Sequence, residues 1–325
     1  MQGIRSSKNS DCLELMMVMI NKQTLFFSLP WILLLLICLN TLMYKKNNQF
    51  TEENNLLDGC HNVYLDVGTN IGVSIRKLFE PEKYPNASLH SIFDANFGTL
   101  ENRLRVFSEN DKMLCAVGFE PNIDHSLFLK EIETAYHKCG WKIKIMTETA
   151  VSDHTGTATF YRWISSNSDN HPINLGAGIH PPKINYFSDL YNQENTDKGY
   201  TIAKLLRLSD FVKTVVNTRR LPIWPRSTPP KVVMKMDIEG SEVEVVPDLI
   251  FSGALQYIDV MSVEWHGFAE LTVSRKEAHG KLKDVLEKLS TFPIRRGENG
   301  NSFRFSVIEM DDETYFKTKF ELPKC

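Results

Sequence analysis

Four short polar segments of the sequence carry residue types that could do chemistry, and each lies at the end of an apolar run. They are 66–72 (DVGTNIG), 120–122 (EPN), 147–152 (TETAVS) and 235–242 (KMDIEGSE). If the apolar runs are parallel strands of one open α/β sheet, their carboxyl ends meet at one edge, where such sheets bind ligands. The four segments therefore predict a single ligand site.

The first segment is a glycine-rich turn. Gly68 and Gly72 let the backbone pass close to a ligand, and the helix expected after them offers free N–H groups to a carboxylate or phosphate. The spacing is neither the Gly-x-Gly-x-x-Gly of dinucleotide-binding folds nor a phosphate loop ending in Gly-Lys-Ser/Thr. Taken alone, the turn fits either a ligand cradle or a structural tight turn.

The second and third segments place polar groups after the next two expected strands. Glu120, with Asn122 beside it, is positioned to accept both hydroxyl groups of a ribose, although a solvated loop carboxylate would show the same pattern. Glu148 and Ala150 lie where backbone and side-chain groups could meet the edge of an adenine.

The fourth segment puts charges at the end of a strand that is otherwise apolar. Lys235, Asp237 and Glu239 are costly there unless they are paired or bound to a ligand, so they are either catalytic or a structural lysine–carboxylate pair. His266 follows another apolar run and titrates near neutrality. It is a second candidate for a general base, and otherwise a hydrogen-bonded loop histidine.

The cysteine and histidine spacings do not indicate a metal site. No Cys-x-x-Cys or Cys-x-His pattern occurs, so we expect no resident metal. Four of the six cysteines, Cys60, Cys115, Cys139 and Cys325, belong to the main body and allow three pairings. Disulfides would suit an oxidising compartment, whereas Cys115, inside an apolar run, would also suit a buried thiol.

Apolar runs that alternate with helical patterns must position these segments. We expect strands over 62–67, 113–119, 141–145, 157–161, 232–236 and 258–263, with helices between several of them and a terminal antiparallel hairpin over 292–294 and 303–308. A capping box at Ser274 opens the helix before the hairpin. The alternation predicts a doubly wound α/β sheet with helices on both faces. The polar stretch 164–200 is expected to be a long loop.

Together the four segments resemble the FkbM-type family of S-adenosylmethionine-dependent methyltransferases. The resemblance runs from about Val63 to Trp265 and is carried by 65–72 (LDVGTNIG), 119–122 (FEPN), 150–152 (AVS) with Gly156, and 236–242 (MDIEGSE). It implies a Rossmann-like methyltransferase fold whose mostly parallel seven-stranded sheet ends in an antiparallel strand. The chain departs from the common pattern by an insertion of about 40 residues after Gly72 that includes 91–98.

The resemblance also implies roles for the candidate residues. Asp66 would back the turn, and Glu120 would hold the ribose. Asp237 and Glu239 would face the methyl group and the acceptor. The methionine end of the cofactor S-adenosylmethionine would lie against the residues of the glycine turn, namely Gly68, Thr69, Asn70 and Gly72. The adenine would lie beside Glu148 and Ala150.

Composition and hydropathy suggest where the protein works. The 325 residues are 42% hydrophobic with a net charge of −3, which excludes wholesale disorder and gives no basis for nucleic-acid binding. The 22 uncharged residues between Lys22 and Lys45 suffice for a helix that crosses a ~30 Å hydrocarbon layer. We expect a tail (1–23), one transmembrane anchor (24–44), a stem (45–57) and a body (58–325) that is lumenal, in the Golgi or endoplasmic reticulum. A signal peptide or a buried helix is the alternative for 24–44.

The expected function is O-methylation of a hydroxyl on a glycan or other small-molecule acceptor of the secretory pathway. Two other classes stay open. A metal-dependent glycosyltransferase would share the single anchor and could use 237–239 (DIE) as an acidic metal site. A non-catalytic binding protein could keep the same fold.

Overall fold

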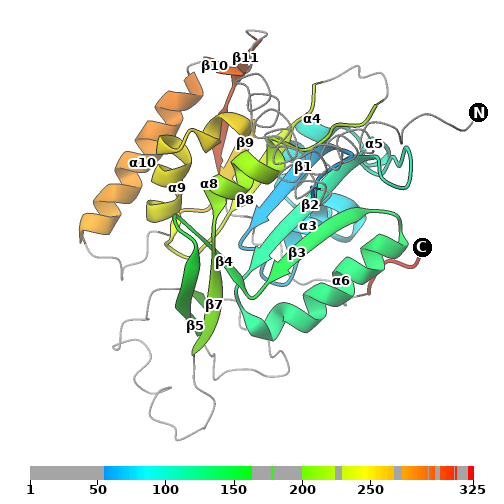
Figure 1. Cartoon of the computed structure of the whole chain (residues 1–325), viewed down its shortest axis with the longest axis horizontal. Helices are drawn as coiled ribbons and strands as arrows, with labels where there is room; N and C mark the ends of the chain where they lie inside the picture. The colour runs from blue at the N-terminus through cyan, green and yellow to red at the C-terminus, as the bar shows by residue number, and fades with distance from the viewer. Residues whose placement is uncertain are drawn as a thin grey trace, which may run out of the picture. The chain divides into compact units, whose positions relative to one another are not determined.

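The fold centres on a six-stranded sheet in which all neighbouring strands run parallel (Figure 1). Its order is β12-β9-β8-β1-β2-β3. The bounds are β1 Cys60–Val67, β2 Lys112–Glu120, β3 Lys142–Thr147, β8 Val232–Met236, β9 Val260–Val263 and β12 Ser306–Glu309. The computed structural model describes residues 55–162, 177–178, 200–223, 229–266, 273–291, 293–296, 301–310, 312 and 321–325.

The central strand β1 is buried along its whole length, as its continuous apolar run predicts. Successive side chains point to opposite faces of the sheet, so β1 contributes Val63, Leu65 and Val67 to one core cluster and Tyr64 to the other. β1 pairs with β2 on one side and with β8 on the other. The ends of these three strands are therefore held in a fixed register.

Helices cover both faces of the sheet, which confirms the doubly wound α/β arrangement. On one face lie α3 (Val73–Phe79), α4 (Leu89–Phe97) and α6 (Ser126–Lys138). On the other lie α8 (Leu208–Phe211), the π-helix η3 (Val212–Val216), α9 (Glu242–Phe251), the 3-10 helix η4 (Ala254–Tyr257) and α10 (Val273–Thr291). The insertion after Gly72 is helical: between α3 and β2 the chain forms η1 (Pro81–Lys83), then α4, then α5 (Leu100–Arg103). A further short helix, η2 (Ile123–His125), connects β2 to α6.

The C-terminal strands differ from the prediction of a seven-stranded sheet with an antiparallel last strand. The hairpin forms, as β10 (Pro293–Arg296) and β11 (Asn301–Arg304), but it is a separate two-stranded sheet. The main sheet has six strands among the described residues, and its edge strand β12 runs parallel to β9. Phe305 lies between β11 and β12, and its side chain is 1% exposed in the core.

A small mixed sheet packs beside the main one. β4 (Thr149–Ser152), β7 (Tyr200–Arg207), β5 (Gly156–Arg162) and β6 (Ala177–Gly178) lie in that order. The extra strand expected over 157–161 is therefore confirmed as β5. The rest of the predicted loop 164–200, apart from β6 and the first residue of β7, lies outside the described residues.

Two disulfides select one of the three possible pairings: Cys60–Cys115 and Cys139–Cys325. The first joins β1 to β2 with both cysteines fully buried, so Cys115 is not a free thiol. The second fastens the C-terminal segment to the end of α6.

The compact unit that contains the sheet begins at Leu56 and runs to Cys325, and Leu57 already lies in its core. The predicted tail, the anchor over 24–44 and most of the stem lie outside the described residues. Within the described part of the chain, no helix has the length and apolar character needed to span a membrane.

Candidate functional site

The candidate site lies at the carboxyl ends of β1 and β8. From β1 the chain proceeds outward to β2 and β3, and it then returns to build β8, β9 and β12 on the other side. The sheet order therefore reverses between β1 and β8, which is the position where open α/β sheets bind ligands. Asp66, Glu120 and Asp237 come together at this edge, as the sequence analysis expected of their segments.

The glycine turn brings the ends of β1 and β8 into close approach. Gly68 has φ +88°, and a Cβ atom added to it would lie 1.7 Å from the carbonyl oxygen of Asp237. Gly72, with φ +82°, immediately precedes α3. A side chain at Gly68 would push the two strand ends apart, so this glycine is required by the geometry of the turn.

Glu120 ties the turn to the end of β2. One carboxylate oxygen accepts the Asn70 N–H at 2.6 Å, and the other accepts the Asn122 N–H at 2.8 Å. The side chain of His125 lies 3.5 Å away, and Glu120 itself is only 5% exposed. A carboxylate has about four acceptor positions, so Glu120 keeps acceptor capacity for the hydroxyls of a ligand.

Asp66 lies beneath the turn with no exposure to solvent. The Tyr64 hydroxyl donates to its Oδ1 at 3.4 Å, while Oδ2 has no hydrogen-bond partner among the described residues. Burial raises the pKa of Asp66 to about 7, an effect that the charge of Lys235 opposes and that of Asp237 reinforces. Near neutral pH, Asp66 therefore exchanges a proton inside the protein core.

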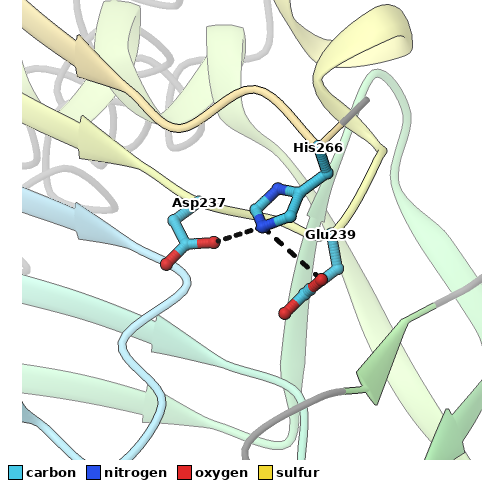
Figure 2. Close-up of side chains that lie close together, drawn as sticks. All are labelled: Asp237, Glu239 and His266. Atoms are coloured by element: carbon cyan, nitrogen blue, oxygen red, sulfur yellow. Dashed lines mark ion pairs between the residues drawn. The ribbon is translucent and has the colours of Figure 1, made fainter. Parts of the chain in front are cut away.

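Side chains from the ends of β8 and β9 meet beside the turn (Figure 2). Asp237 accepts a 2.6 Å hydrogen bond from the Lys235 ammonium group. The Nε2 atom of His266 lies 3.4 Å from Asp237 Oδ1 and 3.6 Å from Glu239 Oε2. Lys235 thus forms the lysine–carboxylate pair that was one of the two alternatives considered from the sequence, and a catalytic role for it stays a prediction.

Burial and neighbouring charges shift the proton affinities of this group. Burial raises the pKa of Glu239 to about 8, although the charge of His266 opposes the shift. Burial lowers the pKa of His266, but hydrogen bonds with Glu242 and Glu264 and the charges of Glu239 and Asp237 outweigh it, so this pKa is raised to about 11. Glu239 and His266 therefore both hold a proton at neutral pH.

Asp237, Glu239 and His266 also satisfy the geometry of a cation site. Each offers one ligand atom, and the three atoms lie within 4.8 Å of one another. The sequence analysis expected no metal, because His266 comes from a different strand and shows no ligand spacing with the carboxylates. The arrangement can therefore transfer protons or hold a cation.

Backbone strain also marks this edge of the sheet. Among the described residues, the non-glycine residues with positive φ are Asn70 (53°), Glu148 (56°) and Glu239 (55°). Each follows the end of a strand of the main sheet, and each is a predicted site residue. Such conformations cost about 1–3 kcal/mol and tend to persist where function requires them.

Glu148 and Ala150, which are predicted to lie beside an adenine, are not part of the cluster formed by Asp237, Glu239 and His266. Glu148 accepts a hydrogen bond from the Ser126 hydroxyl at the start of α6. The side chain of Ala150 packs with Phe160, Ala203 and Leu205 in the core of the small sheet. The side chain of Ala150 thus serves packing in the described structure.

Sequence reasoning assigned no role to three side chains that shape the site: Glu242, Glu264 and His125. Glu242 is fully buried, and its Oε1 lies 3.3 Å from His266 Nδ1. Glu264 Oε1 lies 3.5 Å from His266 Nε2. The proximity of Glu264 to His266 in the sequence was a usable signal, whereas nothing in the sequence connects Glu242 to His266.

No family model, curated protein or solved structure matches the chain. The function must therefore be inferred from the geometry and chemistry of the site.

Proposed function

We propose that this protein is a membrane-anchored S-adenosylmethionine-dependent methyltransferase that methylates a hydroxyl group of a glycan or another secretory-pathway acceptor. The observation that carries the proposal is the junction of the glycine turn after β1, Glu120 after β2 and Asp237 after β8. Gly68 touches the backbone of Asp237, and Glu120 accepts the N–H of Asn70. The FkbM-type motifs lie at these same positions.

The cofactor is assigned to the turn side of the junction. Bound there, S-adenosylmethionine would supply a methyl group made electrophilic by its sulfonium. Gly68, Thr69, Asn70 and Gly72 would hold its methionine end, since the turn exposes backbone at a helix start. Glu120 would use its free acceptor positions for the ribose hydroxyls, and Asn122 fixes Glu120 by its N–H. The adenine would lie toward Glu148 and the backbone of Ala150.

The acceptor is assigned to the β8–β9 side. A hydroxyl must lose its proton as its oxygen forms a bond to carbon, and a carboxylate within hydrogen-bond reach can take that proton. Asp237 is our first choice, because its Oδ2 is held by Lys235 while its Oδ1 faces the group formed by Glu239 and His266. Alignment and exclusion of water by the surrounding buried side chains supply the rest of the rate enhancement.

The proposed location rests on two features. The uncharged stretch over 24–44 has the length of a membrane anchor. The two disulfides in the body are typical of proteins that fold in an oxidising compartment such as the endoplasmic reticulum.

Thermal melting of the full-length chain with added ligands tests the cofactor assignment. A ligand at 100 times its dissociation constant should add about 2.7 kcal/mol of stability. We expect S-adenosylmethionine and S-adenosylhomocysteine to raise the melting temperature, and NAD to leave it unchanged. Glu120→Gln should remove the increase, whereas Glu101→Gln, a surface substitution on α5, should keep it.

Other outcomes of the melt would favour the other two classes. The ligand set Asp237, Glu239 and His266 is the specific observation that keeps a metal-dependent glycosyltransferase in consideration. Stabilisation by a UDP-sugar with Mn²⁺, and not by the sulfur cofactors, would replace the methyltransferase proposal with that one. A cooperative melt that no ligand shifts would favour a non-catalytic binding protein.

A further inference from the structure

Carboxylate oxygens of four residues lie within 3.6 Å of the ring nitrogens of His266. Its Nε2 lies 3.4 Å from Asp237 Oδ1, 3.5 Å from Glu264 Oε1 and 3.6 Å from Glu239 Oε2 (Figure 2 shows Asp237 and Glu239). Charge-assisted N–H···O bonds are about 2.7–2.9 Å long, so these separations are too long for strong hydrogen bonds. Ligand atoms bound to one cation at about 2.0–2.2 Å stand about 3.0–3.6 Å apart, and the separations between Nε2 and the oxygens of Asp237 and Glu239 lie in this range.

Glu242 provides a second, independent observation. It is fully buried, and its Oε1 lies 3.3 Å from the other ring nitrogen, Nδ1 of His266. Its Oε2 makes no hydrogen bond in the described structure and lies 3.8 Å from His279 Nε2. A carboxylate that accepts the Nδ1 proton fixes the ring and directs the Nε2 lone pair outward, as in carboxylate–histidine–metal arrangements.

The charged groups around His266 also favour a bound cation. Four carboxyl groups surround the imidazole, namely Asp237, Glu239, Glu242 and Glu264. Lys235 forms an ion pair with Asp237. Partly buried carboxylates are costly unless they are paired with a cation, and a divalent ion that displaces the protons of Glu239 and His266 would be the largest local charge in the site.

We propose that His266, Asp237 and Glu239 form a binding site for a divalent cation of the manganese type, with Glu242 as the positioning residue of His266. Two carboxylates suit Mg²⁺ and Mn²⁺, and one imidazole shifts the preference toward the first-row transition ions. The ligands come from the segments that directly follow β8 and β9.

The cation would extend the proposed function without depending on it. A divalent ion at this position can bind an acceptor oxygen and lower the pKa of its hydroxyl group, so that the proton can leave to water. Asp237 would then act as a ligand of the ion and not as the general base. Binding of the ion itself needs neither S-adenosylmethionine nor an acceptor. The two proposals can therefore fail separately.

A Mn²⁺ titration of the full-length, chelator-treated chain tests the site, with free Mn²⁺ measured by electron paramagnetic resonance. We expect one saturable site in the wild type. His266→Ala and Glu239→Gln should each weaken binding at least tenfold. The matched control is His154→Ala, which removes an exposed histidine 2.6 Å from Asp153 and should leave the affinity unchanged.

Two results of the titration would contradict the proposed cation site. No saturable Mn²⁺ uptake by the wild type would overturn the proposal, and so would equal losses in His154→Ala and His266→Ala. A cooperative thermal melt of each variant shows that the variant is folded. If His266→Ala does not melt cooperatively, the Mn²⁺ affinity of Glu239→Gln tests the proposal in its place. Because the titration contains no cofactor, its result is independent of the melting experiment with S-adenosylmethionine.

Discussion

Gly68 is the residue on which the close approach of β1 and β8 depends. Gly68→Ala places a Cβ 1.7 Å from the Asp237 carbonyl oxygen at φ +88°, so we expect the free energy of unfolding to fall by at least about 2 kcal/mol. Stabilisation by S-adenosylmethionine should be lost as well. Urea denaturation and ligand melts measure both effects.

Gly280 in α10 is the matched control for this substitution. A Cβ added there meets nothing within 4 Å. Gly280→Ala should therefore raise stability by about 0.5–1 kcal/mol, because alanine is the better helix former. Equal effects of the two substitutions would contradict the assigned role of Gly68.

Asp66 should make the stability of the protein depend on pH. Its pKa is raised from 3.8 to about 7 by burial, so the native state holds a proton that the unfolded chain has released. The stabilisation is fully present below pH 3.8 and is lost as the pH rises through about 7. The melting temperature should therefore fall from pH 5 to 8 in the wild type and fall less in Asp66→Asn.

The surface substitution Asp210→Asn serves as the control for that pH series, because the Asp210 side chain is 51% exposed. Its melting curve should run parallel to that of the wild type. Parallel curves for Asp66→Asn and the wild type would show that Asp66 does not titrate in this range.

At the residue scale, position after an apolar run was the useful signal in the sequence. Asp66, Glu120 and Asp237 each lie at the end of a buried strand, and they meet because parallel strands share one edge. Glu242 could not be identified in this way, because it lies in the first turn of α9 and reaches His266 only through the fold. A buried contact between distant segments leaves no local pattern.

At the scale of elements, Phe305 separates the hairpin β10–β11 from the edge strand β12. Phe305→Ala should lower the free energy of unfolding by about 3–5 kcal/mol, since the ring is 1% exposed in the core. Phe251→Ala removes a ring that is 88% exposed on α9 and should change stability by no more than about 0.5 kcal/mol. Chemical denaturation of both variants makes the comparison, and similar losses would exclude an anchoring role for Phe305.

The same segment shows which parts of the fold the sequence could predict. Alternating apolar residues and glycines at 297 and 300 predicted a hairpin, and a hairpin forms. The pattern could not show that the run over 303–308 is divided between two sheets. Local alternation shows which side chains of a strand face inward, but it does not show which strand lies beside it. β12 pairs with β9, which lies more than 40 residues earlier in the sequence.

At the scale of the whole molecule, the two disulfides should differ in their access to reductants. Cys60 and Cys115 are fully buried, whereas Cys325 is exposed. Mild dithiothreitol followed by iodoacetamide should label Cys139 and Cys325 in the native protein, while Cys60 and Cys115 should react only after unfolding. Peptide mass spectrometry identifies the labelled sites, and early labelling of Cys60 would contradict the buried position of the first disulfide.

The pairing of β1 with β8 has a consequence for how the chain reaches its native state. Val63 lies beside Val232, 169 residues later in the sequence, so the centre of the sheet is completed by a contact of very long range. Such contacts form slowly, because the entropy of closing the intervening chain is lost before they stabilise anything. Until β8 arrives, the hydrogen-bonding edge of β1 is open to other chains. The pairing of β1 with β8 should therefore form late, and ligand binding should appear only in the last kinetic phase of refolding.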